Sequence, residues 1–254
     1  MPVLGVGTHP DPDLTAPYFV EALSGLAEGL PGWAVKVNPT GIVDAWVLLA
    51  PTGRPGGIPP ETPVVSVSGA LAGWPSIEVD NVLAAASMAE FLWSRGHRRF
   101  GFVGGKREMS DARAREQGFR EALMRRGAWN DAWVWDGRFD RASGRAAGDA
   151  WLASMERPTA VFAANDHMAL GVMDAARARG ARWAVAGFDD IPEAEAAGLT
   201  TVRVPIRAMA RRAGEWVFRW QRSGRSSVPD KELFTAERVE RESTHFTPAV
   251  EGRA

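Results

Sequence analysis

Short apolar runs alternate along this chain with longer stretches in which apolar residues recur at every third or fourth position. The short runs are typical of strands covered on both faces, and the longer stretches are typical of helices with one buried face. Strands are predicted at residues 3–7, 33–37, 45–49, 63–67, 100–103, 132–135, 160–164, 183–187, 200–204 and 233–241. Helices are predicted at residues 16–30, 81–95, 112–126, 141–155, 166–180, 192–197 and 206–222. This alternation indicates an α/β protein with parallel sheets flanked by helices.

One connection does not fit that scheme. Only residues 38–44 separate the strands predicted at 33–37 and 45–49. Parallel neighbours need a connection of about a dozen residues or more. Either the strand at 33–37 runs antiparallel, or this part of the fold has lost an element.

The segment from Pro158 to Gly171 places a polar Asn165-Asp166 pair between a buried strand and a helix. Asp166 is a good helix N-cap, and Gly180 stands where a helix commonly ends. Asn165 should therefore lie at the carboxyl end of a parallel strand, which is the edge where open α/β sheets hold ligands. The pair could instead make only the turn and the helix cap, and other segments of the sequence must distinguish a ligand site from that alternative.

Composition narrows the class of protein. The chain has 254 residues, of which 45% are hydrophobic and 24% charged, and this is enough for one large globular domain or two lobes. A formal net charge of −1 argues against a nucleic-acid surface on this chain. Cysteine is absent, which excludes disulfides, thiolate metal sites and cysteine nucleophiles.

Targeting and catalytic signals are also missing. The amino terminus begins on a strand-like run with no signal peptide or membrane span, so we expect a cytoplasmic protein without membrane contact. No dinucleotide-binding loop, phosphate-binding loop or Gly-x-Ser-x-Gly elbow occurs, and the four histidines are dispersed. We therefore expect no catalytic residue, no metal site and no cofactor.

Six ordered motifs resemble the effector-binding core of lactose-repressor/galactose-repressor (LacI/GalR) transcription regulators. They are Ser76-Ile-Glu-Val-Asp-Asn81, Arg95-Gly-His-Arg-Arg-Phe-Gly-Phe-Val-Gly-Gly105, Phe162-Ala-Ala-Asn-Asp-His-Met-Ala-Leu-Gly171, Gly187-Phe-Asp-Asp-Ile-Pro192, Leu199-Thr-Thr-Val-Arg-Val-Pro205 and Arg241-Glu-Ser243. The resemblance covers nearly the whole chain and is closest from Ser76 to Arg207.

This resemblance implies a periplasmic-binding-protein-like fold, in which two doubly wound parallel-sheet lobes are joined by three crossing strands. The amino-terminal lobe would comprise residues 1–104 and 205–238, and the carboxyl-terminal lobe residues 105–204 and 239–254. A sugar or sugar derivative would bind in the cleft and favour lobe closure. Family members are homodimers that bind operator DNA through an amino-terminal helix-turn-helix, which this sequence lacks because it opens on the first strand of the core.

The resemblance also implies the ligand contacts. Arg115 matches an arginine that reaches the effector, and its planar fork suits vicinal hydroxyls or a carboxylate. Asn165 matches a ligand amide that can both donate and accept hydrogen bonds, and Asp189 matches a ligand carboxylate. Asp190 is read instead as a helix cap, and Asp166 remains a cap.

Aromatic residues complete the predicted site. Phe139 matches an aromatic that packs on the effector ring, and Tyr18 and Phe19 match the cleft side of the first helix. Core packing is the alternative for all three. Asp11 and Asp13 could also reach the cleft, or could simply belong to a loop.

The sequence thus predicts the effector-sensing domain of a transcriptional regulator, a repressor in the first instance. A solute-binding protein of a sugar transporter shares the fold but should carry an export signal, and the Gly187-Phe-Asp-Asp190 and Arg241-Glu-Ser243 segments fit it poorly. An enzyme on the same fold is the third possibility.

Overall fold

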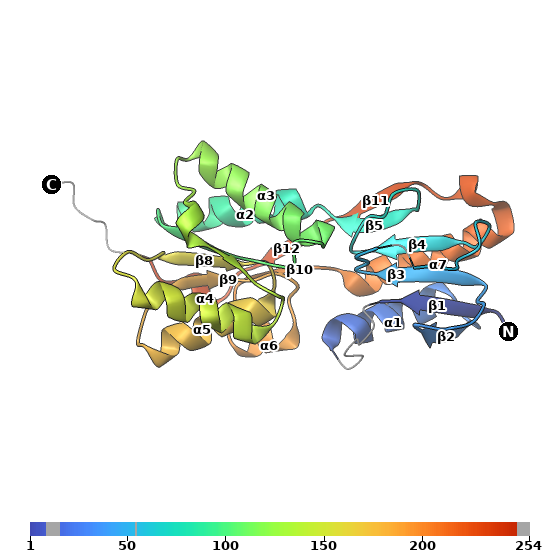
Figure 1. The fold of residues 1–254 in the computed structure, drawn as a ribbon, viewed down its shortest axis with the longest axis horizontal. Coiled ribbons are helices and arrows are strands. Elements are labelled where there is room, and N and C mark those ends of the chain that lie inside the picture. The colour runs from blue at the N-terminus through green and yellow to red at the C-terminus, as the bar shows by residue number, and fades with distance from the viewer. Residues whose placement is uncertain (9–15, 54, 248–254) are drawn as a thin grey trace. The chain divides into compact units, whose positions relative to one another are not determined.

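The structure is a computed structural model that describes residues 1–8, 16–53 and 55–247. The chain forms two compact units (Figure 1). Unit 1 contains Met1–Asp80 and Pro205–Thr235, and unit 2 contains Asn81–Val204 and the chain from Ala236 onward.

Unit 1 is built on a six-stranded sheet in which every pair of neighbours is parallel. Its order is β11 (Lys231–Phe234), β5 (Ser76–Val79), β4 (Val64–Val67), β3 (Ala45–Leu49), β1 (Val3–Gly7) and β2 (Ala34–Val37). Two long helices, α1 (Pro17–Gly29) and α7 (Ile206–Ser223), pack against each other, and α7 also contacts β3, β4 and β5. A short 3-10 helix at Arg225–Ser227 follows α7.

The short connection at residues 38–44 contains no helix. Strand β2 nevertheless runs parallel to β1, with Val6 paired to Val37, so the antiparallel alternative is wrong. Strands β2 and β3 lie on opposite sides of β1 and are not neighbours. Because β2 and β3 are both parallel to β1, residues 38–44 must return the chain to the start of β3, and they do so without a crossover helix. Of the two alternatives, only that of a lost element remains.

Unit 2 has a four-stranded parallel sheet with two helices on each face (Figure 1). Its order is β7 (Val134–Asp136), β6 (Phe100–Gly104), β8 (Ala160–Ala163) and β9 (Ala184–Ala186). Helices α2 (Asn81–Ser94) and α3 (Ser110–Arg125) pack together on one face, and α4 (Arg141–Ala153) and α5 (Asp166–Ala178) pack together on the other. The short helix α6 (Pro192–Ala196) follows β9.

Two further strands of unit 2, β10 (Thr201–Arg203) and β12 (Glu237–Val239), form an antiparallel pair. Single bridges from Ala186 to Thr200 and from Asp189 to Arg203 connect β10 with the edge of the main sheet. Short 3-10 helices lie at Asp131–Trp133 and Glu242–Thr244.

The core of unit 2 fixes how closely its layers approach. On the α2/α3 face, Phe102, Phe119 and Phe162 lie within 5.0–5.8 Å of one another by ring centroids, and each is at most 1% exposed. On the other face, Gly144 and Gly171 let α4 and α5 meet backbone to backbone, because an added Cβ would lie 2.0 Å and 2.1 Å from a carbonyl oxygen of the facing helix. The sheet is therefore held between two tightly packed helix pairs.

Three expectations about the chain's course need correction. Residues 81–104 belong to unit 2, because β6 is a central strand of that unit's sheet and α2 packs on α3. The chain passes between the units at 80/81, 204/205 and 235/236 and not near Gly104 and Val239. The single strand expected at 233–241 is two strands, β11 in unit 1 and β12 in unit 2, and β5 is a strand that the apolar pattern missed.

Candidate functional site

Four of the predicted ligand residues lie near the carboxyl ends of the strands of unit 2. The chain leaves β6 through α3 to reach β7 on one side, and it returns through α4 to β8 on the other side of β6. The gap between the ends of β6 and β8 is thus a topological switch point, where α/β sheets commonly hold ligands. Asn165 follows β8, Asp189 follows β9, Phe139 follows β7, and Arg115 lies on the helix that follows β6.

Arg115 is buried, with a side chain that is 6% exposed, and its donors are directed by the surrounding structure. Its Nε donates to Oδ1 of Asn81 at 2.8 Å, and one terminal nitrogen donates to the Ala164 carbonyl at 2.6 Å. Its terminal nitrogens also lie 3.3 Å from a carboxylate oxygen of Asp111 and 3.5 Å from one of Asp189. The guanidinium carbon stands 3.8 Å from the centroid of the Phe188 ring. Arg115 is therefore held in one orientation beside Asp189.

Asn165 connects the helix start to the neighbouring loop. Its backbone is extended, its Oδ1 accepts from the Met168 N–H at 3.0 Å, and its Nδ2 donates to the Phe139 carbonyl at 3.0 Å. Asn165, and not Asp166, is thus the N-cap of α5, which corrects the expected cap. One N–H of the amide has no hydrogen bond among these and is the donor that Asn165 can offer to a ligand.

Phe139 is brought to the same place. Its φ of 67° is uncommon for a residue with a side chain, and this backbone turn aims the carbonyl at Asn165. Its ring lies against Gly105, where an added Cβ would be 2.1 Å from the ring. Gly105 is therefore required for the ring position.

Asp189 stands in a strained turn at the end of β9. Its φ is 115° and that of Asp190 is 64°. The Asp189 side chain is 31% exposed, which leaves a carboxylate face open beside Arg115. Burial raises the pKa of Asp189 above its ordinary value, an effect that the positive charge of Arg115 opposes and the negative charge of Asp111 reinforces.

Asp190 points elsewhere. Its carboxylate pairs with Arg203 of β10 at 2.6 Å and with Arg241 at 2.8 Å, and its side chain is 7% exposed. Arg203 lies just before the chain leaves unit 2 at 204/205, and Arg241 follows β12, so Asp190 anchors the turn to those segments. The N-cap of α6 is Ile191, so the reading of Asp190 as a helix cap is wrong, and its omission from the ligand contacts stays a prediction.

The sequence missed two members of the arginine cluster. Asp111 and Asn81 are 8% and 6% exposed, and both contact Arg115. Asp111 could have been found as the acidic residue four positions before Arg115 on the same helix. Asn81 had no comparable signal, because its helix is far from Arg115 in the sequence.

The remaining candidates are not brought together with these residues within one unit. Tyr18 and Phe19 belong to α1 of unit 1, where they are half-buried and contact each other edge to face at 5.3 Å. Asp11 and Asp13 lie outside the described residues. The structure thus assembles Arg115, Asn165, Asp189 and Phe139, and it leaves the contribution of α1 as a prediction.

More than half of the chain matches a known family of protein domains. Residues 89–244, more than half of the chain, match the model of the periplasmic binding protein-like domain. The chain belongs to this family. The match includes all four residues assembled in unit 2 and ends beside the Arg241-Glu-Ser243 motif.

Relatives of this periplasmic binding protein-like domain are transcription regulators. The HTH-type transcriptional regulator GalS of Salmonella typhimurium is 37% identical over 144 residues, which are 54% of this chain and 42% of GalS. The HTH-type transcriptional repressor CytR of Escherichia coli is 33% identical over 146 residues, 55% of this chain and 43% of CytR. The matched part is thus less than half the length of these relatives. They confirm the resemblance to the effector-binding core of LacI/GalR regulators.

Solved structures agree over a larger part of the chain. The transcriptional regulator CelR in complex with cellobiose is 27% identical, with a TM-score of 0.82 over 95% of this chain and 84% of CelR. A regulatory protein of the LacI family from Chloroflexus aggregans, 23% identical, has a TM-score of 0.81 over 95% of this chain and 98% of its own. The periplasmic-binding-protein-like α/β fold is therefore confirmed.

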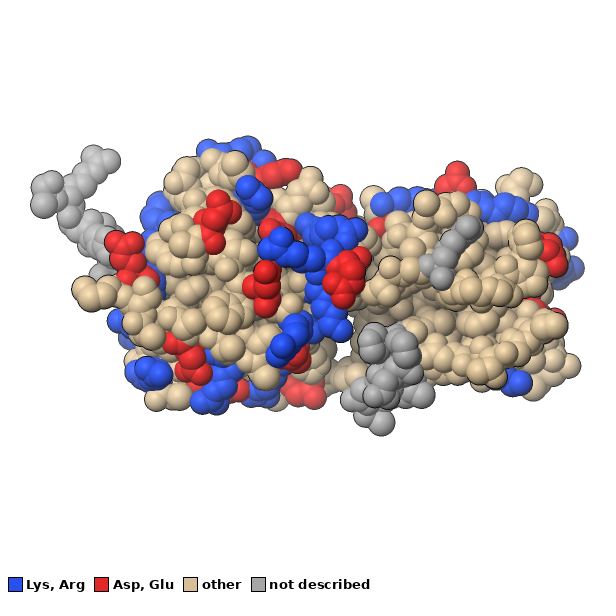
Figure 2. Space-filling view, viewed as in Figure 1, with Lys and Arg blue, Asp and Glu red and all other residues tan. Residues whose placement is uncertain are grey.

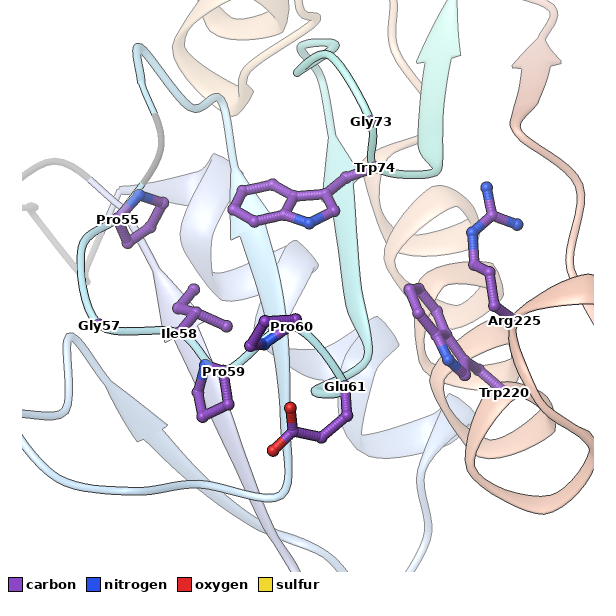
Figure 3. Close-up of a pocket in the computed structure, with 10 residues that line it drawn as sticks. All are labelled: Pro55, Gly57, Ile58, Pro59, Pro60, Glu61, Gly73, Trp74, Trp220 and Arg225. Atoms are coloured by element: carbon purple, nitrogen blue, oxygen red, sulfur yellow. The ribbon is translucent and has the colours of Figure 1, made fainter.

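A cavity of about 550 Å³ lies in unit 1 (Figure 3). It is lined by Pro55, Gly57, Ile58, Pro59, Pro60, Glu61, Gly73, Trp74, Trp220 and Arg225. Arg225 already donates to the Val228 carbonyl and pairs with Asp230. This cavity therefore offers a ligand aromatic and proline surfaces but a cation that is engaged within the chain.

Charge and membrane signals add little to this assignment. Figure 2 shows acidic and basic side chains side by side on the visible face of unit 2, and mostly uncharged residues on that of unit 1. In the described part of the chain, no helix is long and apolar enough to cross a membrane. The same residues contain no group of three or more His, Asp or Glu side chains arranged to hold a metal ion.

Proposed function

We propose that this domain senses a small-molecule effector on behalf of a DNA-binding transcriptional regulator, and that the regulator is a repressor. The observation that carries the proposal is the pairing of a fixed, buried Arg115 with a partly open Asp189 carboxylate at the switch point of a parallel sheet. The family membership and the repressors among its relatives support it. DNA contact would be made by a helix-turn-helix module outside this sequence, and the regulator would act in the cytoplasm.

A sugar or sugar derivative is the effector class we favour. Arg115 supplies N–H donors, Asp189 supplies acceptors, and Asn165 keeps one donor free, which together suit neighbouring hydroxyl groups. The Phe139 ring would cover an apolar sugar face. The complex of the similar regulator CelR with cellobiose supports this class.

The effector would act by favouring one of two conformations of the regulator. A difference in effector affinity equivalent to about 1–3 kcal/mol changes operator affinity roughly 5- to 150-fold. Nothing catalytic is required of the site, and the relatives are regulators and not enzymes.

A thermal-shift panel tests the proposal. The compounds are monosaccharides, disaccharides including cellobiose, sugar phosphates, nucleobases and polyols. A true effector at about 100 times its dissociation constant should stabilise the protein by about 2.7 kcal/mol. Asp189→Asn should abolish this shift while the variant folds normally, because asparagine tolerates the left-handed backbone at this position but loses the carboxylate. Arg113→Ala, an exposed change on the same helix, is the matched control and should keep the shift.

The assignment is wrong if the best compound stabilises Asp189→Asn as much as the parent. The transporter alternative is tested separately, by reading the gene upstream of residue 1. A helix-turn-helix there supports the regulator, whereas an export signal supports a solute-binding protein.

A further inference from the structure

The carboxyl group of Asp166 is enclosed directly behind the proposed site. The residue is 0% exposed and is the first residue of α5. Its two oxygens lie 2.5 Å from the Thr201 hydroxyl and 3.0 Å from the Ile191 backbone nitrogen. The backbone of Gly187 presses on it so closely that an added Cβ would be 2.2 Å from one carboxyl oxygen. No room remains around this carboxyl for a solvation shell.

No cation accompanies this buried acid. The three arginines around the turn are engaged elsewhere, with Arg115 on Asp111 and Asp189, and with Arg203 and Arg241 on Asp190. Over residues 16–53 and 55–247, no ion pair in the structure includes Asp166. The negative charge of Asp189 acts on Asp166 and disfavours a second negative charge there.

A buried carboxylate without a cation is costly, and such a group usually keeps its proton instead. We propose that Asp166 is a positioning residue that stays protonated at neutral pH and holds the Asp189–Asp190 turn in the shape the effector site needs. Its contacts fit this role, since they tie the start of α5 to Ile191 after the turn and to Thr201 of β10. Burial, followed by the charge of Asp189, raises the pKa of Asp166 to about 8, whereas the hydrogen bonds from Thr201 and from the backbone of Ile191 and Asp190 oppose the rise.

The positioning role of Asp166 at the effector site rests on the proposed function, whereas its protonation at neutral pH does not. The ionisable groups in and around the turn are Asp189 and Asp190, with Arg115, Arg203 and Arg241 paired to them and Asp111 paired to Arg115. Among these described residues, Asp166 is the carboxyl group without a paired arginine. Burial raises its pKa, as it also raises that of Asp189.

The Ile191 backbone amide reports on this proton, because it donates directly to the Asp166 carboxyl. We expect its ¹H–¹⁵N resonance in the ligand-free protein to titrate with a midpoint above about pH 7. In Asp166→Asn, whose amide copies a neutral acid, the resonance should no longer titrate. Asp174→Asn removes a partly exposed carboxylate, paired with Arg141, from the same helix and should leave the titration unchanged.

Two outcomes would overturn the proposal. One is an Ile191 midpoint below about pH 5 in the parent protein, which can be measured even if the variant does not fold. The other is a titration that keeps its full size and midpoint in Asp166→Asn, which would assign the proton to Asp189. A thermal-shift panel in which no compound binds would contradict the proposed function, but it would not affect the conclusion that Asp166 is protonated.

Discussion

Arg115 is at once the most informative and the most constrained of the site residues. The motif selects it over Arg113, and the structure shows that Arg115 is buried whereas Arg113 is exposed. Its contacts with Asn81, Asp111 and the Ala164 carbonyl show that it is also a structural cation inside unit 2. Its removal would leave Asp111 buried and without its counter-ion.

Arg115→Ala should therefore destabilise the protein by about 3–5 kcal/mol, which is the usual cost of breaking a buried ion pair on one side. Arg113→Ala should change the stability little. Chemical denaturation of both variants provides the comparison. A loss of less than about 1 kcal/mol for Arg115→Ala would show that its burial is not structurally important.

His97 is a second buried ionisable group with a measurable consequence. It is 0% exposed, and its ring nitrogens lie 3.0 Å from the Thr159 hydroxyl and 3.0 Å from the Phe246 carbonyl. Burial lowers its pKa from 6.5 to about 4, an effect that the bond to Phe246 opposes. The unfolded chain therefore takes up a proton between these pH values while the folded chain does not.

Stability due to neutral His97 should thus be lost as the pH falls from about 6.5 to about 4, by roughly 3 kcal/mol at most. The free energy of unfolding of His97→Gln should lack this acid-sensitive contribution. Free energies of unfolding of parent and variant, measured at several pH values, should converge on the acid side. Curves that stay parallel from neutral to acid pH would contradict the assigned pKa.

The helices and strands show where local pattern suffices and where it does not. Helix ends at Gly96 and Gly180 were predictable, because both glycines take the left-handed backbone that closes a helix. The division of residues 233–241 was not, since one extended run serves two sheets and nothing local marks the passage at 235/236. Strand β5 was missed because Ser76 and Glu78 interrupt its apolar pattern.

The positions of some site residues could also be predicted from the sequence. Residues that follow strands, such as Asn165 and Asp189, could be placed at one sheet edge from the strand–helix alternation. The strained φ of Phe139 and the buried partners of Arg115 could not be predicted, because they depend on contacts between distant segments.

The α1–α7 contact of unit 1 depends on glycine and gives a test of the packing. A Cβ added to Gly25 would lie 2.1 Å from the Arg207 carbonyl oxygen, whereas one added to Gly41 would meet no atom within 4 Å. Gly25→Ala should cost about 1–3 kcal/mol by forcing the helices apart. Gly41→Ala should be close to neutral. Thermal unfolding of both variants checks this, and equal stabilities would contradict the close approach.

Assembly is the next level at which the family assignment makes a prediction. We expect a homodimer with helix α2 at its interface. Leu83 on α2 is 66% exposed, and Met124 on the neighbouring α3 is 56% exposed, so this surface has apolar side chains to bury.

Sedimentation equilibrium at micromolar concentration should give the mass of two chains. Leu83→Asp should shift the equilibrium toward the monomer at least tenfold, because it buries a charge in the interface. Met155→Asp, at a residue that is 100% exposed, is the control and should leave the dimer intact. A parent protein that sediments as one chain would refute the dimer.

The two units offer two different places for a ligand, and we assign the effector to residues of unit 2. Amide chemical-shift mapping of the strongest binder from the thermal-shift panel distinguishes these places. We predict the largest shifts at Gly105, Phe139, Asn165 and Asp189, around the ends of the unit 2 strands. Shifts confined to the cavity of unit 1, at Ile58, Trp74 and Trp220, would contradict it.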